Sequence, residues 1–363
     1  MVETKAIEKI NKNFTVLEAN TIFLVLAGVF LTLGAYVQSR EVLSGLLITE
    51  YGIVLLPIIL YSLATRKNLK KVFRLNRLSI KSIFQIIGVA ITLLPIIVLA
   101  NLITLWIVEL FSDSILSEIP TANNQSEYLI LMFIISITAG ICEEGFFRGM
   151  VLNAYETKVG RRWGAIFSGI LFGVFHFNPQ NFLGPIVLGI VFSYLVQVTN
   201  SIWASVIAHA TNNGIAVTMG YVINKFMPAV DVESMSGASL SPSEILIVIA
   251  FYGGLALITI FALVYLLKQI KKDHPDLKRG NAINIQGHQY NVLGVKSEML
   301  YLQENPEDIE SLKAVRLNDL KHYKFDVLTP FWEKSPLKLS VLEIFPLVLT
   351  LIMYGYIIYY AYF

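Results

Sequence analysis

The stretch from Gly140 to Met150 holds the side chains with the clearest potential for chemistry. Its sequence is Gly-Ile-Cys-Glu-Glu-Gly-Phe-Phe-Arg-Gly-Met, and it follows an apolar run that begins at Tyr128. Two carboxylates and a guanidinium therefore stand where a membrane helix would ordinarily carry only hydrocarbon. Ionisable groups are expensive inside a bilayer, and those that occur there usually serve a function.

Helical spacing separates the two glutamates of this stretch. Residues four apart lie on one helix face, so Glu144 and Arg148 are neighbours, with the acid before the base in the favourable order. A buried structural ion pair would account for these two side chains. It would not account for Glu143, which points elsewhere and has no basic partner nearby in the sequence. Glu143 must find its hydrogen bonds, its proton or its chemistry on another helix.

Three more polar side chains fall within apolar segments. His176 ends an apolar run in which Phe172 lies one turn earlier, and His209 and Asn213 are four residues apart and share a helix face. A single histidine in a membrane is more often a hydrogen-bond partner between helices than a catalyst. Two histidines, an aligned asparagine and an unpaired glutamate together favour a functional site.

The rise of about 1.5 Å per helical residue gives an estimate of depth. Counted from the basic turn near Lys158, Glu143 and His176 each lie roughly 20 Å along their helices. Counted from Thr199, His209 lies about 15 Å along its own helix. These side chains can therefore meet in one layer of the bilayer.

Such a set of side chains suits amide hydrolysis. A glutamate can take a proton from water, a histidine can share that proton, and a neutral histidine with an asparagine amide can donate to an oxyanion. The sequence has no Asp in any expected span, no Gly-x-Ser-x-Gly and no His-Glu-x-x-His, so the usual aspartyl, serine and zinc protease signatures are missing. A metal-free mechanism is favoured. The alternative is a zinc ion held by Glu143, His176 and His209, because two histidines and one carboxylate can bind zinc.

Composition places these residues in a polytopic membrane protein. The chain has 363 residues, of which 55% are hydrophobic and 15% charged, which is too apolar for an ordinary soluble domain. The net charge of +2 gives no reason to expect nucleic acid as a partner. The single cysteine, Cys142, excludes an internal disulfide and is interpreted as a packing residue. A polar start and a long first apolar run predict a retained signal anchor.

We expect an all-α bundle of about nine membrane spans, since each span takes about 20 apolar residues. The fifth and sixth are the shortest. The expected spans are Asn20 to Val37, Leu46 to Ala64, Ile83 to Leu110, Tyr128 to Tyr155, Trp163 to Phe177, Phe182 to Val198, Ile202 to Ile223, Ile245 to Leu267 and Val341 to Phe363.

Basic residues predict how the bundle is oriented. Seven Lys or Arg occur from Arg66 to Lys81, three near Lys158, and five from Lys268 to Arg279. With nine spans, all of these segments fall on one side, which the positive-inside rule makes cytoplasmic. We therefore expect a multi-pass protein of the cell membrane with a cytoplasmic N-terminus and an external C-terminus.

The chain divides into three expected parts. Residues 1–268 form the membrane bundle, with its chemical core at about 126–225; residues 269–340 form a small cytoplasmic segment; and residues 341–363 form a last transmembrane helix. Within the small segment, Asn281 to Val295 predicts a hairpin around Gln286-Gly287-His288, and Asn305-Pro306-Glu307 predicts a helix that continues to about Tyr323. The histidines of this segment lack metal-ligand spacing and are expected at the solvated surface: His274, His288 and His322.

Three spaced motifs resemble the CPBP family of intramembrane proteases, which includes the type II CAAX prenyl endopeptidases and the bacterial Abi-type proteins. The motifs are Glu143-Glu144-x-x-x-Arg148, Phe172-x-x-x-His176 and His209-x-x-x-Asn213, in that order, within about residues 126–225. The first motif alone would be weak evidence. The three together inside membrane spans are fairly specific.

The resemblance implies a role for each motif residue. Glu143 would activate water together with His176, and His209 with Asn213 would form the oxyanion site. The residues implied in support are Glu144, Arg148 and Phe172. The implied substrate is a membrane-associated peptide or protein, either prenylated or a precursor peptide. No cofactor is favoured, and zinc stays the alternative.

Two other classes of function compete with a protease. A non-catalytic scaffold or bacteriocin-immunity protein could use the same cavity, although a scaffold has no physical need for an unpaired carboxylate in the membrane. A proton-coupled transporter would also use buried Glu and His residues. It would be favoured by inverted repeats with matching helix breaks, and the sequence contains neither.

Overall fold

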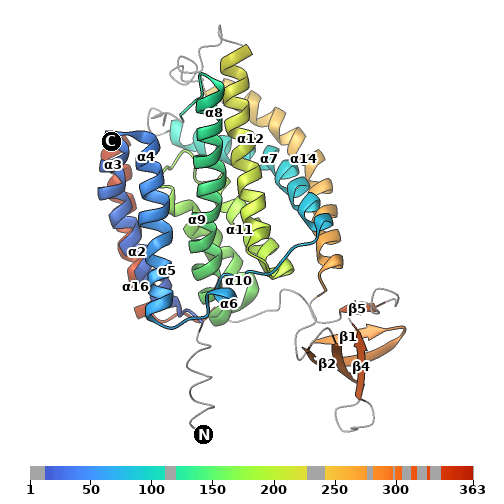
Figure 1. The fold of residues 1–363 in the computed structure, drawn as a ribbon. Coiled ribbons are helices and arrows are strands. Elements are labelled where there is room, and N and C mark those ends of the chain that lie inside the picture. Colours follow the sequence, from blue (N-terminus) through green and yellow to red (C-terminus); the bar gives the residue numbers. More distant parts are fainter. Residues whose placement is uncertain are drawn as a thin grey trace.

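A helix bundle with a small β-sheet at one end makes up the fold (Figure 1). The computed structural model describes residues 13–110, 120–226, 242–275, 281–296, 299–304, 312–316, 325–327 and 337–362. Within these residues, six helices or helix series are long and apolar enough to cross a membrane: Val16–Arg40, Val42–Ala64, Ile80–Glu109, Gln125–Phe175, Ser243–Asp273 and Val341–Tyr359. The expected all-α polytopic bundle is confirmed.

The series Gln125–Phe175 combines two of the nine expected spans. It turns at Gly160, whose φ of 82° and ψ of 169° are not helical, in the basic turn after Lys158. Helix α11 (Leu183–Thr199) has 17 residues, so it is about 25 Å long, less than the roughly 30 Å of a hydrocarbon core. Within the described residues, each expected span matches a helix, a helix series or a part of one, and overruns its ends by no more than two residues. The count of nine crossings stays a prediction.

Several of these series are interrupted by π-helical turns, which occur often at functional sites. The first two series are α2 (Val16–Val29), η1 (Phe30–Gly34) and α3 (Ala35–Arg40), followed by α4 (Val42–Leu47), η2 (Ile48–Leu55) and α5 (Leu56–Ala64). The short α6 (Leu69–Val72) and the long α7 (Ile80–Glu109) follow. The central series is α8 (Gln125–Leu131), η3 (Met132–Thr138), α9 (Ala139–Phe146), η4 (Phe147–Val151) and α10 (Leu152–Phe175), and the remaining helices are α12 (Trp203–Phe226), α14 (Pro242–Asp273) and α16 (Val341–Tyr362).

Side-chain caps fix where the membrane helices begin. Thr15 and Glu18 form a capping box at the start of α2, Ser79 accepts from the backbone N–H of Ser82 at the start of α7, and Asn124 caps α8. These caps satisfy N–H groups that have no partner within the helix.

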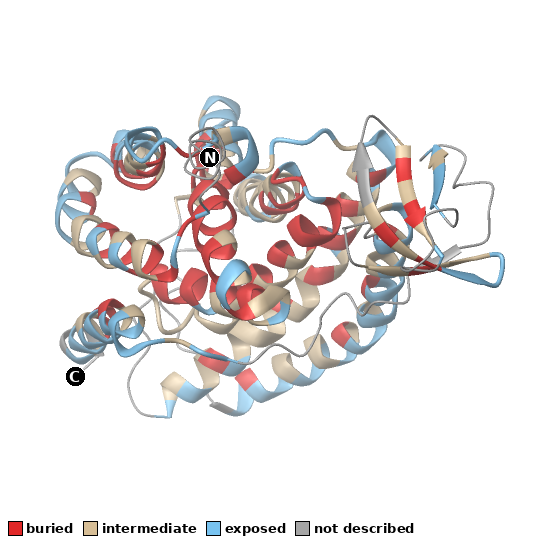
Figure 2. Cartoon of the chain, turned by 90° about the horizontal axis from the view of Figure 1, so that it is seen from below, coloured by how far each residue is buried: buried red, intermediate tan, exposed pale blue. Residues whose placement is uncertain are grey.

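Buried residues gather in the interior of the bundle (Figure 2). Apart from Arg148, the largest fully enclosed side chains are aromatic and include Phe146, Phe147, Phe172 and Phe192. The outlying helices α14 and α16 instead expose large apolar side chains, such as Phe261 and Leu342. An apolar outer face is what a helix bundle presents to lipid.

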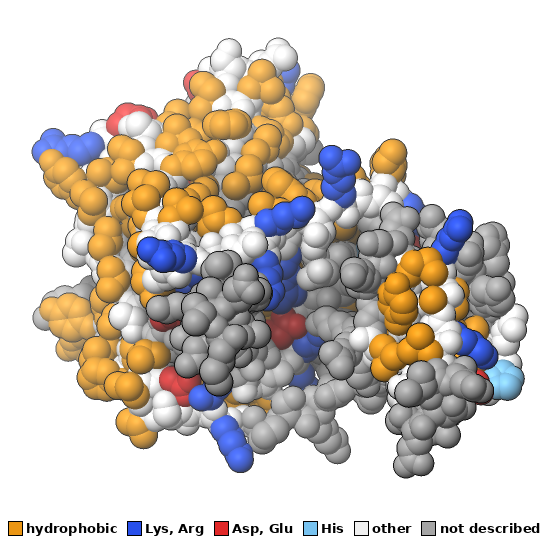
Figure 3. Space-filling model, turned by 60° about the horizontal axis from the view of Figure 1, so that its bottom comes forward, with side chains coloured by type: hydrophobic (Ala, Val, Ile, Leu, Met, Phe, Trp, Pro, Cys, Tyr) orange, Lys and Arg blue, Asp and Glu red, His pale blue; other side chains and the backbone are white. Residues whose placement is uncertain are grey.

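Ion pairs bring the three basic segments to one end of the bundle. Arg74 binds Glu156 at 2.6 Å, beside the basic turn of α10, and Lys81 binds Asp273 at 2.8 Å, at the end of α14. Lysine and arginine side chains are visible across this end in the space-filling view (Figure 3). The basic segments therefore share one side as expected, and its assignment to the cytoplasm stays a prediction.

An antiparallel five-stranded sheet occupies the segment before α16, with the strand order β4-β3-β2-β1-β5. The strands are β1 (Ala282–Ile285), β2 (His288–Lys296), β3 (Met299–Gln303), β4 (Leu312–Arg316) and β5 (Phe325–Val327). The hairpin around Gln286-Gly287-His288 is confirmed, because Gln286 and Gly287 take the positive φ values, 53° and 95°, that a two-residue hairpin turn requires.

The helix expected from Asn305 to about Tyr323 is wrong. Strand β4 lies in its middle and pairs with β3, from Met299 opposite Arg316 to Gln303 opposite Leu312. The rest of that stretch, 305–311 and 317–323, lies outside the described residues. The Asn-Pro-Glu signal is local, whereas pairing with β3 supplies a ladder of hydrogen bonds that the sequence pattern does not reveal.

The histidines of this segment differ from one another. His274 is half-buried, and its Nε2 lies 2.9 Å from the hydroxyl of Ser82 on α7, so the expectation of a solvated surface residue is wrong for it. His288 is exposed and bonds Glu304 at 3.0 Å. His322 lies outside the described residues.

Candidate active site

Close helix packing brings the polar side chains of four segments together. A Cβ on Gly189 of α11 would come within 2.6 Å of the Cα of Gly169 on α10, so only glycine permits this contact between the two backbones. A Cβ on Gly140 of α9 would lie 3.4 Å from the backbone of Ala210 on α12. These approaches surround α9 and η4, which carry the two glutamates and the arginine.

Glu144 and Arg148 form the buried ion pair that their spacing predicts. Arg148 donates from Nη1 to Oε1 of Glu144 at 2.8 Å, and both side chains are 0% exposed. Arg148 also donates from Nη2 to the carbonyl of Gly189 on α11 at 3.0 Å. The pair therefore ties η4 to α11 as well as neutralising its own charges.

Aromatic rings enclose the Arg148 guanidinium. Its central carbon lies 4.7 Å from the ring centre of Phe172, 5.5 Å from Phe192 and 5.9 Å from Phe147. A cation over such ring faces is attracted by the ring quadrupole, more strongly where water is excluded. The rings thus compensate part of the cost of burying the guanidinium.

His209 is bonded to the same carboxylate. Its Nδ1 lies 2.9 Å from Oε1 of Glu144, and its residue is 4% exposed. An ionised carboxylate only accepts hydrogen bonds, so Nδ1 carries the proton. In neutral His209 the Nε2 atom then has a lone pair, and it becomes a donor only when the imidazole is protonated.

His176 is fixed in the same tautomer by a different acceptor. It is the residue that follows the last turn of α10, and its Nδ1 lies 2.8 Å from the carbonyl oxygen of Phe172. Because a carbonyl cannot donate, Nδ1 carries the proton and Nε2 of the neutral ring has a free lone pair. This nitrogen can accept a proton from water or bind a metal.

Phe172 links the two histidines. Its ring centre lies 4.8 Å from the His176 ring and 5.8 Å from the His209 ring. The expected convergence of His176 and His209 is therefore visible as contact with one phenyl group, which also covers Arg148.

Asn213 uses its amide to join two helices. It donates from Nδ2 to the carbonyl of Ile135 on η3 at 2.9 Å, and its Oδ1 accepts from Asn212 at 3.2 Å. One amide N–H remains for another acceptor. No hydrogen bond joins Asn213 to His209 within the described part of the chain, so its oxyanion role stays a prediction.

Glu143 is half-buried, and its Oε2 atom is enclosed without a hydrogen-bond partner among the described residues. A second carboxyl in the same condition is Glu50, on η2, whose Oε2 is also enclosed and unpartnered. Sequence reasoning missed Glu50, although it lies inside the expected span Leu46 to Ala64. The rule that singled out Glu143, an ionisable residue within an apolar span, would have found it.

The alternative zinc set, Glu143, His176 and His209, has no support from clustering in the described residues. Among them, no group of three or more His, Cys, Asp and Glu side chains lies close enough together to hold a metal ion. His176 keeps the free nitrogen that a metal would need, and His209 keeps Nε2. The metal-free mechanism stays a prediction.

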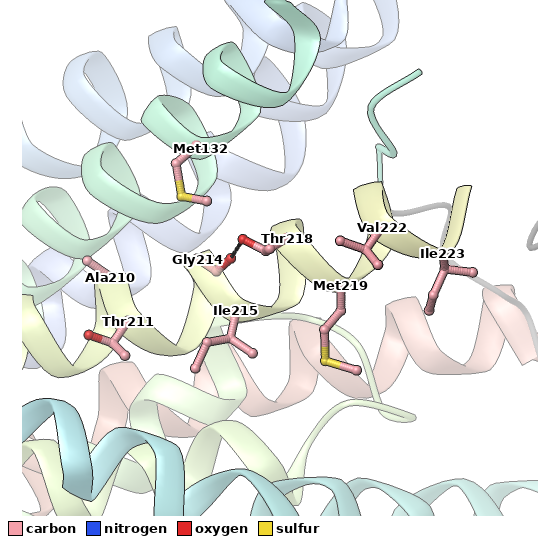
Figure 4. Close-up of a pocket in the computed structure, with 9 residues that line it drawn as sticks. All are labelled: Met132, Ala210, Thr211, Gly214, Ile215, Thr218, Met219, Val222 and Ile223. Carbon is pink, nitrogen blue, oxygen red and sulfur yellow. Dashed lines mark hydrogen bonds between the residues drawn. The ribbon is translucent and has the colours of Figure 1, made fainter. Parts of the chain in front are cut away.

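An apolar groove of about 390 Å³ runs along α12 beside these residues (Figure 4). Met132 of η3 forms one wall, and the α12 residues that line it begin at Ala210, next to His209, and continue to Ile223. Helix α12 runs from the sheet end of the bundle toward the opposite end (Figure 1), and the residues that line the groove follow it in that direction. It could hold an extended apolar chain.

Comparison with known families matches the segment that carries this geometry. Residues 125–215 match the family model of the type II CAAX prenyl endopeptidase Rce1-like proteins. Over this segment the chain is similar to that family. The segment includes all three motifs, from Glu143 to Asn213, and ends two residues after the last of them.

A curated relative matches over a similar length. The chain is 28% identical over 90 residues to "Putative membrane peptidase YdiL" of Bacillus subtilis (strain 168). The match covers 25% of this chain and 37% of that relative. No solved structure matches the chain.

Proposed function

We propose that the protein is an intramembrane endopeptidase of the CPBP type that hydrolyses a peptide bond in a membrane-associated substrate. The observation that carries this proposal is the pair of histidines around Phe172, each with its Nδ1 proton fixed and its Nε2 available. Glu143, whose enclosed Oε2 has no hydrogen-bond partner among the described residues, supplies the carboxyl. The family match and the relative's name support a peptidase.

In this proposal Glu143 is the general base that takes a proton from the attacking water. A water molecule attacks the carbonyl carbon of the scissile bond and gives a proton to the Glu143 carboxylate, while Nε2 of His176 accepts a hydrogen bond from the same water. The new C–O bond forms as the carbonyl π electrons move to oxygen. The tetrahedral oxyanion then collapses, the C–N bond breaks, and the proton held by Glu143 passes to the leaving amine.

Donors for the oxyanion come from α12. With its Nδ1 bonded to Glu144, a protonated His209 would donate from Nε2, and Asn213 would donate its remaining amide N–H. This differs from the neutral histidine expected from sequence, because Nδ1 already holds the proton of the neutral ring. Glu144 and Arg148 are positioning residues: Glu144 orients His209, and Arg148 holds Glu144.

The substrate in this proposal carries an apolar segment. The groove along α12 is lined almost wholly by hydrocarbon and begins beside His209, which suits an isoprenyl chain or an extended apolar peptide. A prenylated peptide and a precursor peptide with an apolar stretch are the two substrate types to compare.

The test is cleavage of peptides by purified full-length protein in lipid vesicles. A farnesylated peptide, the same peptide without the lipid, and an apolar precursor-type peptide are incubated with the protein, and new amino termini are identified by mass spectrometry. Glu143→Gln keeps the size of the side chain but cannot act as a base, so it should slow cleavage by roughly 10²- to 10⁴-fold.

The same assay with a strong chelator separates the two mechanisms. Cleavage that survives chelation supports the metal-free reaction. Loss on chelation that is reversed by zinc assigns Glu143, His176 and His209 to a metal site instead. If folded wild-type protein cuts none of the peptides and Glu143→Gln retains the protein's role in cells, the scaffold or immunity function replaces the protease.

A further inference from the structure

The chain leaves α10 through a left-handed residue directly after His176. Phe177 has a φ of 48°, and it stands one residue past the C-cap His176, where a helix that ends in this way usually has glycine. A residue with a bulky side chain is strained in this conformation, so surrounding contacts must hold it there. Because the two residues share one turn, whatever holds Phe177 also acts on His176.

Aromatic side chains from three elements hold the ring of Phe177. Its centre lies 5.8 Å from the ring of Tyr354 on α16, 6.0 Å from Phe30 on η1 and 6.0 Å from Phe175 on α10. The ring of Phe182, at the start of α11, stacks on Tyr354 at 6.3 Å. Tyr354 therefore contacts both ends of the short connection between α10 and α11.

Short hydrogen bonds close the turn that carries His176. The backbone N–H of His176 donates to the carbonyl of Gly173 at 3.3 Å, and the N–H of Phe177 donates to the carbonyl of Val174 at 3.1 Å. The Nδ1 atom of His176 bonds the carbonyl of Phe172 at 2.8 Å. All three bonds lie within the last turn of α10, so they depend on this turn keeping its conformation.

Helix α16 is itself fixed to the bundle at its start. It packs beside α2 (Figure 1), where Asn20 donates to the carbonyl of Glu343 at 2.7 Å, and Lys158 of α10 binds the Glu343 carboxylate at 3.1 Å. Tyr354 lies about three turns further along α16 and is buried. The family match ends at residue 215, so this contact reaches the candidate site from outside the matched segment.

We propose that Tyr354 is a positioning residue for His176. Its ring holds Phe177 in the left-handed conformation, and this conformation fixes the turn from which the His176 imidazole projects. The inference rests on the role proposed for His176 in the reaction. A packing contact with no such role would contribute to stability and leave the orientation of His176 unchanged.

Cleavage kinetics of the full-length protein in lipid vesicles test the effect on His176. Tyr354→Leu removes the ring and should lower kcat by roughly 10- to 100-fold, because a catalytic group displaced by about 1 Å loses rate on that scale. KM should change little, since the groove along α12 is left intact. Tyr354→Phe keeps the ring and should restore kcat to near the wild-type value. Tyr356→Leu, the same substitution at an exposed position of α16, should change neither constant.

Hydrogen exchange of the same proteins tests the turn without any substrate. In Tyr354→Leu the amides of His176 and Phe177 should exchange faster, as measured by mass spectrometry on peptides that cover residues 172–178. In Tyr356→Leu they should exchange as in wild type. Equal exchange in all three proteins would overturn the proposal, as would faster exchange with an unchanged kcat. If wild type cleaves no peptide, the protease proposal fails, while exchange still decides whether Tyr354 holds this turn.

Phe177→Asn covers the case in which Tyr354→Leu does not fold. Asparagine is common in the left-handed conformation at helix ends, so this variant favours the same backbone but lacks the ring that Tyr354 contacts. Faster exchange and a lower kcat in Phe177→Asn would support the ring contact as the anchor. Exchange and kcat like those of wild type would mean that the backbone preference alone sets the turn, and the role of Tyr354 would be rejected.

Discussion

Breaking the buried ion pair should be the most costly single change at the site. Arg148→Met keeps much of the side-chain volume but removes the 2.8 Å bond to Glu144 and the 3.0 Å bond to Gly189. Both members of the pair are fully enclosed, so the Glu144 charge is left without its cation. Removing one partner of such a pair costs about 3 to 5 kcal/mol in the free energy of unfolding.

A double-mutant cycle shows whether the loss arises from the stranded charge. Glu144→Gln combined with Arg148→Met removes both charges, and the Gln oxygen can still accept from His209. The double variant should therefore recover about 2 to 3 kcal/mol relative to Arg148→Met alone. Lys81→Met is the control, because Lys81 in its pair with Asp273 has a side chain that is 65% exposed, and its loss should cost less than about 1 kcal/mol.

The measurement is reversible chemical unfolding of the purified protein in mixed micelles, followed by tryptophan fluorescence. Two results would refute the reasoning. One is an Arg148→Met cost no larger than that of Lys81→Met. The other is a double variant whose cost equals the sum of the two single changes, which would mean that Glu144 and Arg148 contribute independently.

Two further predictions concern helix packing and pH. Gly189→Ala places a Cβ within 2.6 Å of Gly169 and should lower the free energy of unfolding by about 1 to 3 kcal/mol in the same assay. Gly253→Ala is the control, because nothing lies within 4 Å of the new carbon, and it should be neutral or stabilising. Equal effects of the two changes would contradict the close contact. Burial lowers the pKa of His274 below its ordinary 6.5, so the unfolded chain binds this proton more readily. The contribution of neutral His274 to the stability of the fold is therefore complete above about pH 6.5 and declines as the pH falls below that value. His274→Gln should remove this decline from a plot of melting temperature against pH. A plot that His274→Gln leaves unchanged would contradict the lowered pKa.

Much of the candidate site could be predicted because its signals are local. Charged and polar residues inside apolar runs mark the site, and the spacing of four residues puts Glu144 beside Arg148 on one helix face. The same kind of local signal located the hairpin at Gln286 and Gly287. Glu50 carries the same signal, an ionisable side chain inside an apolar run, although the sequence analysis did not name it.

Other features depend on residues that are far apart in the chain. The helix expected up to Tyr323 failed because β4 is stabilised by pairing with β3, and the exposure expected for His274 failed because Ser82, on α7, bonds it. The proton positions on His176 and His209 also depend on which acceptor lies next to each Nδ1. Periodicity carries no information about such acceptors.

Hydropathy and helical spacing act over a few residues, so the sequence alone identifies a polytopic membrane protein and the side chains in it that are too polar for lipid. The sharing of the Glu144 carboxylate between His209 and Arg148 depends on tertiary packing. The contact between His209 and Glu144 joins residues 65 positions apart in the chain. Helix packing sets such contacts, through close approaches such as that of Gly169 and Gly189.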